Sequence, residues 1–296
     1  METKYNKRIM KPENYISATP LPNSEELQKF YAELYYQAPQ SSSYQEHYDD
    51  LEIDYKNLKC NALIHALKSA GAVGGSFLDV GAGEGFLLNA AHKQGFTVTG
   101  LDFSSYGVGK FFPELAKLHM AGDLYESLAK LDSDGKRYMV CSSNNVLEHV
   151  MDPDSFLTSI RKVMDSRGLL AITVPNDFSR LQQLLLKQEM IDREFWFAPP
   201  HHLHYFNTEN VENFLVNRGF EIIDAFADFP VDMYLLHPGS NYVIDEKNGL
   251  AAHQARMHHD LMIAEAGLDK YLDYYRAMFK VGLGRDITLI VRRCSS

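Results

Sequence analysis

The chain has 296 residues, of which 45% are hydrophobic and 23% charged, a composition typical of a soluble globular enzyme. Its 29 Lys and Arg are outnumbered by 39 Asp and Glu, and a net charge of −10 argues against nucleic acid or an anionic membrane as a partner. No apolar run reaches the ~18 residues of a membrane-spanning helix, and the N-terminus lacks the apolar stretch of a signal peptide.

The three cysteines, Cys60, Cys141 and Cys294, are far apart and form no CxxC pair. This spacing gives no zinc signature, and free thiols are typical of a reducing compartment. We therefore expect a cytoplasmic protein without membrane insertion.

Residues 1–50 are predicted to be mostly irregular and polar, with one amphipathic helix over 24–36 that is capped by Ser24. The helix is rich in aromatic residues, so it could cover a pocket as a flap or pack on the domain surface. We expect an N-terminal extension over 1–55 and one domain over 56–296.

From residue 61 onward, strand patterns alternate with helical patterns. Strands are predicted at 76–80, 97–102, 119–123, 137–143, 169–175, 221–229 and 286–293. Helices are predicted at 61–72, 84–94, 106–118, 155–164, 208–220 and 251–280, with Thr208 as the cap of the fifth. This alternation predicts an α/β fold with a mostly parallel sheet and helices on both faces. Two insertions, 176–207 and 230–284, are expected to build the acceptor pocket.

The stretch FLDVGAGEGF, residues 77–86, joins a predicted strand to a predicted helix through three glycines. Such loops bind nucleotide cofactors at the helix N-terminus. A dinucleotide site favours G-x-G-x-x-G, whereas this loop is G-x-G-x-G and contains Glu84, which would repel a pyrophosphate. S-adenosylmethionine carries no phosphate, and Asp79 could orient the loop or reach its ammonium group through water. The loop therefore favours the sulfonium cofactor over NAD and disfavours a dehydrogenase or epimerase.

Acidic residues also follow the next two predicted strands. Asp102 is placed to accept hydrogen bonds from the ribose hydroxyls, and Phe103 could stack on the adenine. Asp123 ends the third strand, where its carboxylate could accept the adenine amino hydrogen.

The motifs LDVGAGEG (78–85), GLD (100–102), GD (122–123) and SNNVLEHV (143–150) together resemble the class I S-adenosylmethionine-dependent methyltransferases, in particular the small-molecule branch with quinone and sugar methyltransferases. The resemblance covers about 60–225. It implies a Rossmann-like sheet of order 3-2-1-4-5-7-6 with an antiparallel last strand, and S-adenosylhomocysteine as product. The predicted cofactor site comprises Asp79, Gly81, Ala82, Gly83, Gly85, Phe86, Asp102, Phe103, Asp123, Leu124, Asn144 and Asn145.

Methyl transfer to a hydroxyl requires a base, and candidate bases lie in two places. Glu148 and His149 follow the fourth strand, and His201, His202 and His204 lie in the segment FWFAPPHHLHYFNTENV (195–211). Sugar methyltransferases have a stretch similar to residues 202–206, and the resemblance favours His202 as the base, followed by His149 and His204. His149 could instead hold the loop in which it lies.

The acceptor side is predicted to include Trp196, His201, Tyr205 and Glu148. The aromatic residues 195–197 could be a wall of the acceptor pocket or a lid packed on the core. A divalent ion held by Glu148, His149 and a later carboxylate is an alternative means of orienting a hydroxyl. No ligand spacing requires an ion, so the predicted site contains no metal.

The sequence therefore predicts a methyltransferase that acts on a small molecule, with O-methylation of a sugar or sugar nucleotide of a surface polysaccharide pathway as the first hypothesis. That acceptor follows from the resemblance alone. The N-terminus lacks the cysteine cluster of sugar C-methyltransferases, which disfavours carbon methylation. A quinone-like or other small metabolite as acceptor, a non-catalytic cofactor-binding protein and a homodimer remain open.

Overall fold

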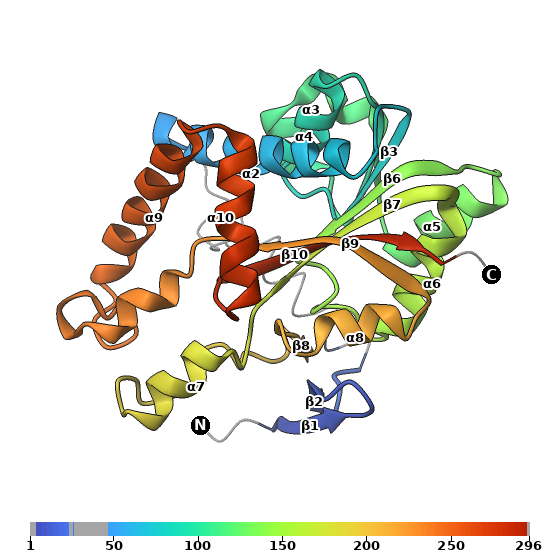
Figure 1. Ribbon diagram of the computed structural model, residues 1–296. Coiled ribbons are helices and arrows are strands. Elements are labelled where there is room, and N and C mark those ends of the chain that lie inside the picture. The colour runs from blue at the N-terminus through green and yellow to red at the C-terminus, as the bar shows by residue number, and fades with distance from the viewer. Residues whose placement is uncertain (1–3, 24–25, 27–46, 295–296) are drawn as a thin grey trace.

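A computed structural model describes residues 4–23, 26 and 47–294 of the chain. Its centre is a seven-stranded sheet of order β5-β4-β3-β6-β7-β10-β9, in which β10 is antiparallel to both neighbours (Figure 1). The strands are β3 (Ser76–Val80), β4 (Thr97–Asp102), β5 (His119–Ala121), β6 (Tyr138–Asn144), β7 (Met164–Pro175), β9 (Phe220–Ala227) and β10 (Asp286–Arg293). In chain order this is 3-2-1-4-5-7-6, so the predicted fold class and strand order are confirmed.

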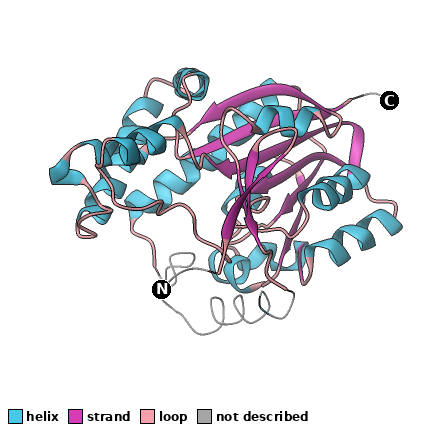
Figure 2. Ribbon diagram, turned by 90° about the horizontal axis from the view of Figure 1, so that it is seen from below, coloured by secondary structure: helices cyan, strands magenta, loops and turns pink. Residues whose placement is uncertain are grey.

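Helices cover both faces of the sheet, as predicted (Figures 1 and 2). One face carries α2 (Asp50–Ser69), α3 (Phe86–Lys93), α4 (Tyr106–Phe111), the 3-10 helix η1 (Pro113–Leu118) and α10 (Leu268–Lys280), and the other carries α5 (Leu124–Ser133), α6 (Pro153–Val163) and α8 (Val211–Val216). Successive strand residues alternate between the two layers: Phe77 packs in one hydrophobic cluster and Leu78 in the other.

The prediction of irregular chain near the N-terminus is wrong for residues 6–19. Instead of irregular chain, β1 (Asn6–Met10) and β2 (Tyr15–Thr19) form a hairpin, and β2 pairs with β8 (His204–Tyr205) in a three-stranded antiparallel sheet. Tyr15 stacks on Phe206 at 5.0 Å between ring centroids, which buries the hairpin against a distant segment. The helix predicted from Ser24 lies outside the described residues except for Glu26.

Several helix predictions also need correction: α2 begins at Asp50 rather than at residue 61, and the helix predicted over 106–118 is α4 followed by η1. The single helix predicted over 251–280 is two helices, α9 (Asn248–Ala264) and α10, because Gly267 between them has φ +97°. Helix α5 was not predicted, and it begins after Asp123, whose side chain accepts a hydrogen bond from Glu126 N at 3.0 Å. Helix α8 begins after Asn210 rather than at the predicted cap, Thr208.

The two predicted insertions pack against each other. Residues 176–207 contain α7 (Arg180–Lys187) and β8, and residues 230–284 contain the 3-10 helices η2 (Val231–Leu236) and η3 (Pro238–Ser240) as well as α9 and α10. Leu181 and Trp196 of the first share a small hydrophobic core with Leu235 of the second. No helix in the described ranges is both long and apolar enough to cross a membrane.

Candidate active site

A cavity of about 440 Å³ opens beside the glycine loop, at the carboxyl ends of β3 and β6. Eight of the twelve predicted cofactor residues line it: Asp79, Gly81, Ala82, Gly83, Gly85, Phe86, Asn144 and Asn145. The other four, Asp102, Phe103, Asp123 and Leu124, lie outside this cavity at the ends of β4 and β5. The predicted residues thus follow the carboxyl edge of neighbouring parallel strands, where ligands bind in such sheets.

The glycines are required by the shape of this loop. Gly81 has φ +84°, and a Cβ there would lie 2.3 Å from Cγ2 of Val146. Gly83 has φ +55°, and no atom lies within 4 Å of the position that its Cβ would occupy. Because this glycine backbone lies beside open space, a ligand can approach it closely. The loop therefore fits the predicted cofactor.

Asp102 joins the end of β4 to the glycine loop. Its Oδ2 accepts a hydrogen bond from Gly83 N at 2.8 Å, and Oδ1 accepts one from Ser104 N at 3.2 Å. A carboxylate oxygen can accept two hydrogen bonds, so each retains capacity for a ribose hydroxyl. Phe103 is 57% exposed beside it. Their contacts with the cofactor stay predictions.

Asp79 is the acidic group at the floor of the cavity. Its side chain is 2% exposed and accepts a hydrogen bond from Ser142 Oγ at 2.7 Å. Burial raises the pKa of Asp79 to about 7; the bond from Ser142 lowers it and the nearby charge of Asp102 raises it further. The carboxyl group therefore changes charge near neutral pH.

Cofactor affinity is expected to fall by up to about tenfold between about pH 8 and about pH 6 if Asp79 binds the cofactor's ammonium group. The raised pKa of Asp79 means that this carboxylate is protonated as the pH falls through about 7, which removes the charge that attracts the cation. Calorimetric titration with S-adenosylmethionine across this range measures the effect. An Asp79→Asn variant should bind the cofactor weakly, with an affinity that does not change with pH. A wild-type affinity that does not change between about pH 8 and about pH 6 would contradict the role of Asp79 in binding the ammonium group.

Glu84 does not act as an isolated charge. Its carboxylate accepts hydrogen bonds from Tyr48 Oη at 2.6 Å and from Lys56 Nζ at 3.1 Å. Since the lysine neutralises it, the expected repulsion of a pyrophosphate is weaker than the sequence suggested. The Glu84 side chain therefore does not decide between S-adenosylmethionine and NAD as the cofactor.

Several cavity residues were missed from the sequence. Helix α2 contributes Lys56, Lys59 and Cys60, and the end of the sheet contributes Asp228 and Asp286. Lys59 Nζ lies 3.0 Å from Asp228 Oδ2 and 3.8 Å from Asp286 Oδ2. A signal was available: because β10 is antiparallel, its first residue lies at the same edge as the carboxyl ends of the other strands.

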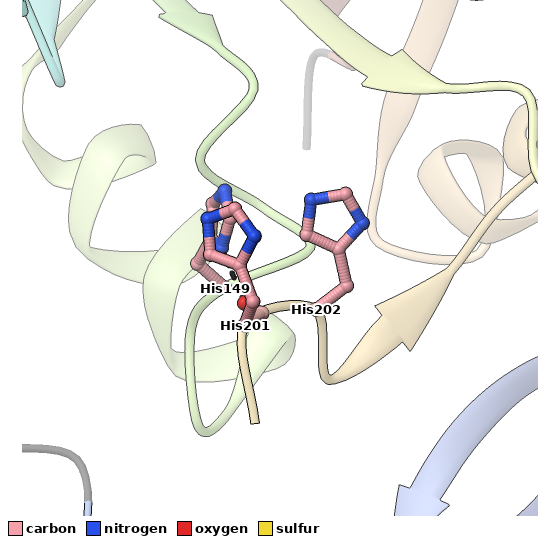
Figure 3. Close-up of side chains that lie close together, drawn as sticks. All are labelled: His149, His201 and His202. Carbon is pink, nitrogen blue, oxygen red and sulfur yellow. Dashed lines mark hydrogen bonds between the residues drawn. The ribbon is translucent and has the colours of Figure 1, made fainter. Parts of the chain in front are cut away.

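A second feature is the imidazole cluster formed by His149, His201 and His202 (Figure 3). His149 follows β6, whereas the other two precede β8, and each pair of ring centroids is 4.8 Å apart. His149 Nδ1 donates a hydrogen bond to the carbonyl oxygen of His201 at 2.6 Å.

Two imidazoles of the cluster have lowered pKa values. Burial, followed by the neighbouring imidazoles, lowers the pKa of His149 to about 3. Burial, followed by His202, lowers the pKa of His201 to about 4. Both rings are neutral at neutral pH.

Asp177 and Arg285 support this cluster, and neither was predicted. Asp177 Oδ2 lies 3.7 Å from His202 Nδ1, and its Oδ1 accepts a hydrogen bond from Arg285 Nη1 at 2.6 Å. Burial alone would raise the pKa of Asp177, but Arg285 and His202 together hold it below its ordinary value. The ionised aspartate lies on the Nδ1 side of His202, and a small shortening of this 3.7 Å distance would orient the ring as in a base–orienter pair.

Glu148 lies beside the cluster and is 1% exposed. Its main-chain oxygen accepts hydrogen bonds from Leu203 N at 2.7 Å and His204 N at 3.1 Å, which joins the two histidine-bearing segments. Neither carboxylate oxygen has a hydrogen-bond partner within the described ranges, although Oε1 lies 3.6 Å from His149 Nε2. Burial raises the pKa of Glu148 well above its ordinary value.

The candidate base His204 and the acceptor-side candidates Tyr205 and Trp196 are packed in the interior. His204 is 3% exposed and contacts Tyr15 at 6.0 Å between ring centroids, and burial lowers its pKa to about 4. Tyr205 donates a hydrogen bond to the carbonyl oxygen of His202 at 2.7 Å, and Trp196 is 2% exposed. This placement favours packing roles for all three, and their part in catalysis or acceptor binding stays a prediction.

A model of the family described as a methyltransferase domain matches residues 51–225. The chain belongs to this methyltransferase family. The resemblance to class I S-adenosylmethionine-dependent methyltransferases is thereby confirmed, together with S-adenosylmethionine as the cofactor.

One known relative of this methyltransferase-family chain is a protein named ubiquinone biosynthesis O-methyltransferase in Vibrio atlanticus. It is 32% identical over 136 residues, which are 40% of this chain and 53% of the relative. A relative of the same name in Sinorhizobium medicae is 28% identical over 164 residues, 51% of this chain and 62% of its own. The chain spans about half the length of these curated relatives. Among solved structures, the Burkholderia thailandensis 1,6-didemethyltoxoflavin-N1-methyltransferase has the same fold, with a TM-score of 0.51 at 14% identity, over 98% of this chain and 99% of that one.

Proposed function

We propose that this protein transfers a methyl group from S-adenosylmethionine to a hydroxyl oxygen of a small molecule. The observation that carries the proposal is the pairing of two features at one edge of the sheet. A glycine-loop cavity suits the cofactor, and the imidazole cluster includes His149, which follows the same strand, β6, whose end carries Asn144 and Asn145 in the cavity wall. A hydroxyl needs a proton acceptor before it can be methylated, and the cluster provides one.

When bound, the cofactor supplies the methyl group: its S–CH₃ bond breaks with the electron pair left on sulfur, while an O–CH₃ bond forms on the acceptor. The residues of the chain position the reactants and take up the acceptor's proton. His202 is the foremost candidate for the proton because Asp177 lies on its Nδ1 side, which leaves Nε2 for the acceptor. His149 is the second candidate, although its Nδ1 is already bonded to the chain.

A sugar or sugar nucleotide is our first acceptor. Besides the glycine loop, the cavity is lined by Lys59, Asp228 and Asp286, whose charged groups are suited to hydrogen bonding with hydroxyl groups. The second candidate is a phenolic hydroxyl of a quinone precursor, which the names of the curated relatives favour. A homodimer stays a prediction.

The test is transfer of an isotope-labelled methyl group from S-adenosylmethionine to a panel of nucleotide sugars and quinone-type phenols. Labelled product from a sugar would support the first acceptor, and product from a phenol the second. Label on an amine alone would contradict O-methylation. If calorimetry detects cofactor binding but extracts of small metabolites never become labelled, the alternative of a non-catalytic cofactor-binding protein would be favoured.

A further inference from the structure

The imidazole cluster has the arrangement of a metal site. One ring nitrogen from each of His149, His201 and His202 lies within 4.8 Å of the other two. The rings come from two segments that the Glu148 main chain joins, and Figure 3 shows them gathered side by side. A Zn–N distance of about 2.0–2.1 Å requires each ring to move inward by less than about 1 Å. Side-chain rotation can supply such a movement.

The outer contacts of two rings also fit metal ligation. Metal-binding histidines usually donate their second ring N–H to a carbonyl or carboxylate, which fixes the tautomer and directs the other nitrogen to the ion. His149 Nδ1 donates to the carbonyl oxygen of His201 at 2.6 Å. His202 Nδ1 faces Asp177 Oδ2 at 3.7 Å, and Arg285 holds that carboxylate in place. These contacts at Nδ1 leave Nε2 of each of the two rings available for an ion.

Glu148 provides an independent indication of a cation. Its carboxyl group is 1% exposed, 3.6 Å from His149 Nε2, and neither oxygen has a hydrogen-bond partner within the described part of the chain. A buried carboxyl group without a partner is costly. A cation among the imidazoles would supply the missing partner.

We propose that His149, His201 and His202 bind a divalent transition-metal ion of the Zn²⁺ or Co²⁺ type, with the acceptor hydroxyl as a further ligand. Imidazole nitrogen suits these ions, whereas Mg²⁺ and Ca²⁺ prefer oxygen ligands. Three protein ligands leave a coordination position open, as in catalytic zinc sites. The inference rests on the proposed function, because the ion would make the hydroxyl acidic enough to lose its proton to water before the methyl group is transferred. His202 then acts as a ligand rather than as the free base.

The test uses the tag-free full-length protein, stripped with a chelator, dialysed and titrated with Co²⁺ while its visible absorption is recorded. We expect one Co²⁺ per chain, displaced by Zn²⁺ but not by Mg²⁺. His149→Ala and His201→Ala should each abolish binding, whereas His258→Ala, an exposed histidine of α9, should retain it. Asp177→Asn should weaken binding by about 10–100-fold through the orientation of His202. Circular dichroism establishes that each variant is folded.

Folded wild-type protein that binds no Co²⁺, or equal binding by the wild type and both histidine variants, would overturn the metal site. Calorimetry with S-adenosylhomocysteine on the same samples separates this failure from that of the proposed function. Cofactor binding without Co²⁺ binding would leave the function intact with His202 as the base. Loss of cofactor binding in folded protein would count against the proposed function, whatever the result with Co²⁺.

Discussion

Replacing His202 with alanine is expected to lower the rate of methyl transfer by about 10²–10⁴-fold, or about 3–5 kcal/mol in activation free energy. The side chain is the member of the imidazole cluster that Asp177 and Arg285 orient. Whether it accepts the proton or holds an ion, its loss leaves the acceptor hydroxyl without activation. Cofactor affinity should not change, because His202 does not line the cofactor cavity.

Turnover with the acceptor found in the labelling experiment measures this effect, and calorimetry measures the affinity for the cofactor. His258→Ala is the matched control, since it removes an exposed imidazole from α9. Ordinary turnover in the His202 variant would transfer the role to His149. Ordinary turnover in both the His202→Ala and the His149→Ala variant would mean that the acceptor reaches the active site already ionised.

Asp102→Ala should weaken cofactor binding by about 1–3 kcal/mol, which is about 5- to 150-fold in Kd. Two effects add: the ribose hydroxyls lose an acceptor, and Gly83 N and Ser104 N lose the carboxylate that now holds the loop against β4. Asp102→Asn keeps one oxygen, so its loss should be smaller. Calorimetry with S-adenosylhomocysteine gives the affinities, and thermal unfolding detects any loss of fold. An alanine variant with wild-type affinity would remove Asp102 from the cofactor site.

The sheet and the cavity beside the glycine loop were predictable because their signals are local. Gly81, Gly83 and Asp102 each lie at a strand end, and strand ends can be recognised from a few neighbouring residues. The parallel order then brings these ends to one edge of the sheet. For this reason eight predicted residues line one cavity although they come from two separate segments of the chain.

The rest depended on pairings between distant segments. Arg285 reaches Asp177 because β10 pairs with β7 in a register that places Asp286 opposite Pro175. Nothing in the neighbourhood of either residue indicates that pairing. The pairing of β2 with β8 was missed for the same reason, since β8 is only two residues long and nearly two hundred positions away from β2.

The small sheet of β1, β2 and β8 ties the beginning of the described chain to the acceptor side. Ala18 N donates a hydrogen bond to Leu203 O at 2.8 Å, and Ser17 pairs with His204, directly after the histidines at 201 and 202. Removing residues 6–19, or fusing a bulky partner directly to them, is therefore expected to disturb the segment that carries His201 and His202, so this part of the chain is a poor place for engineering.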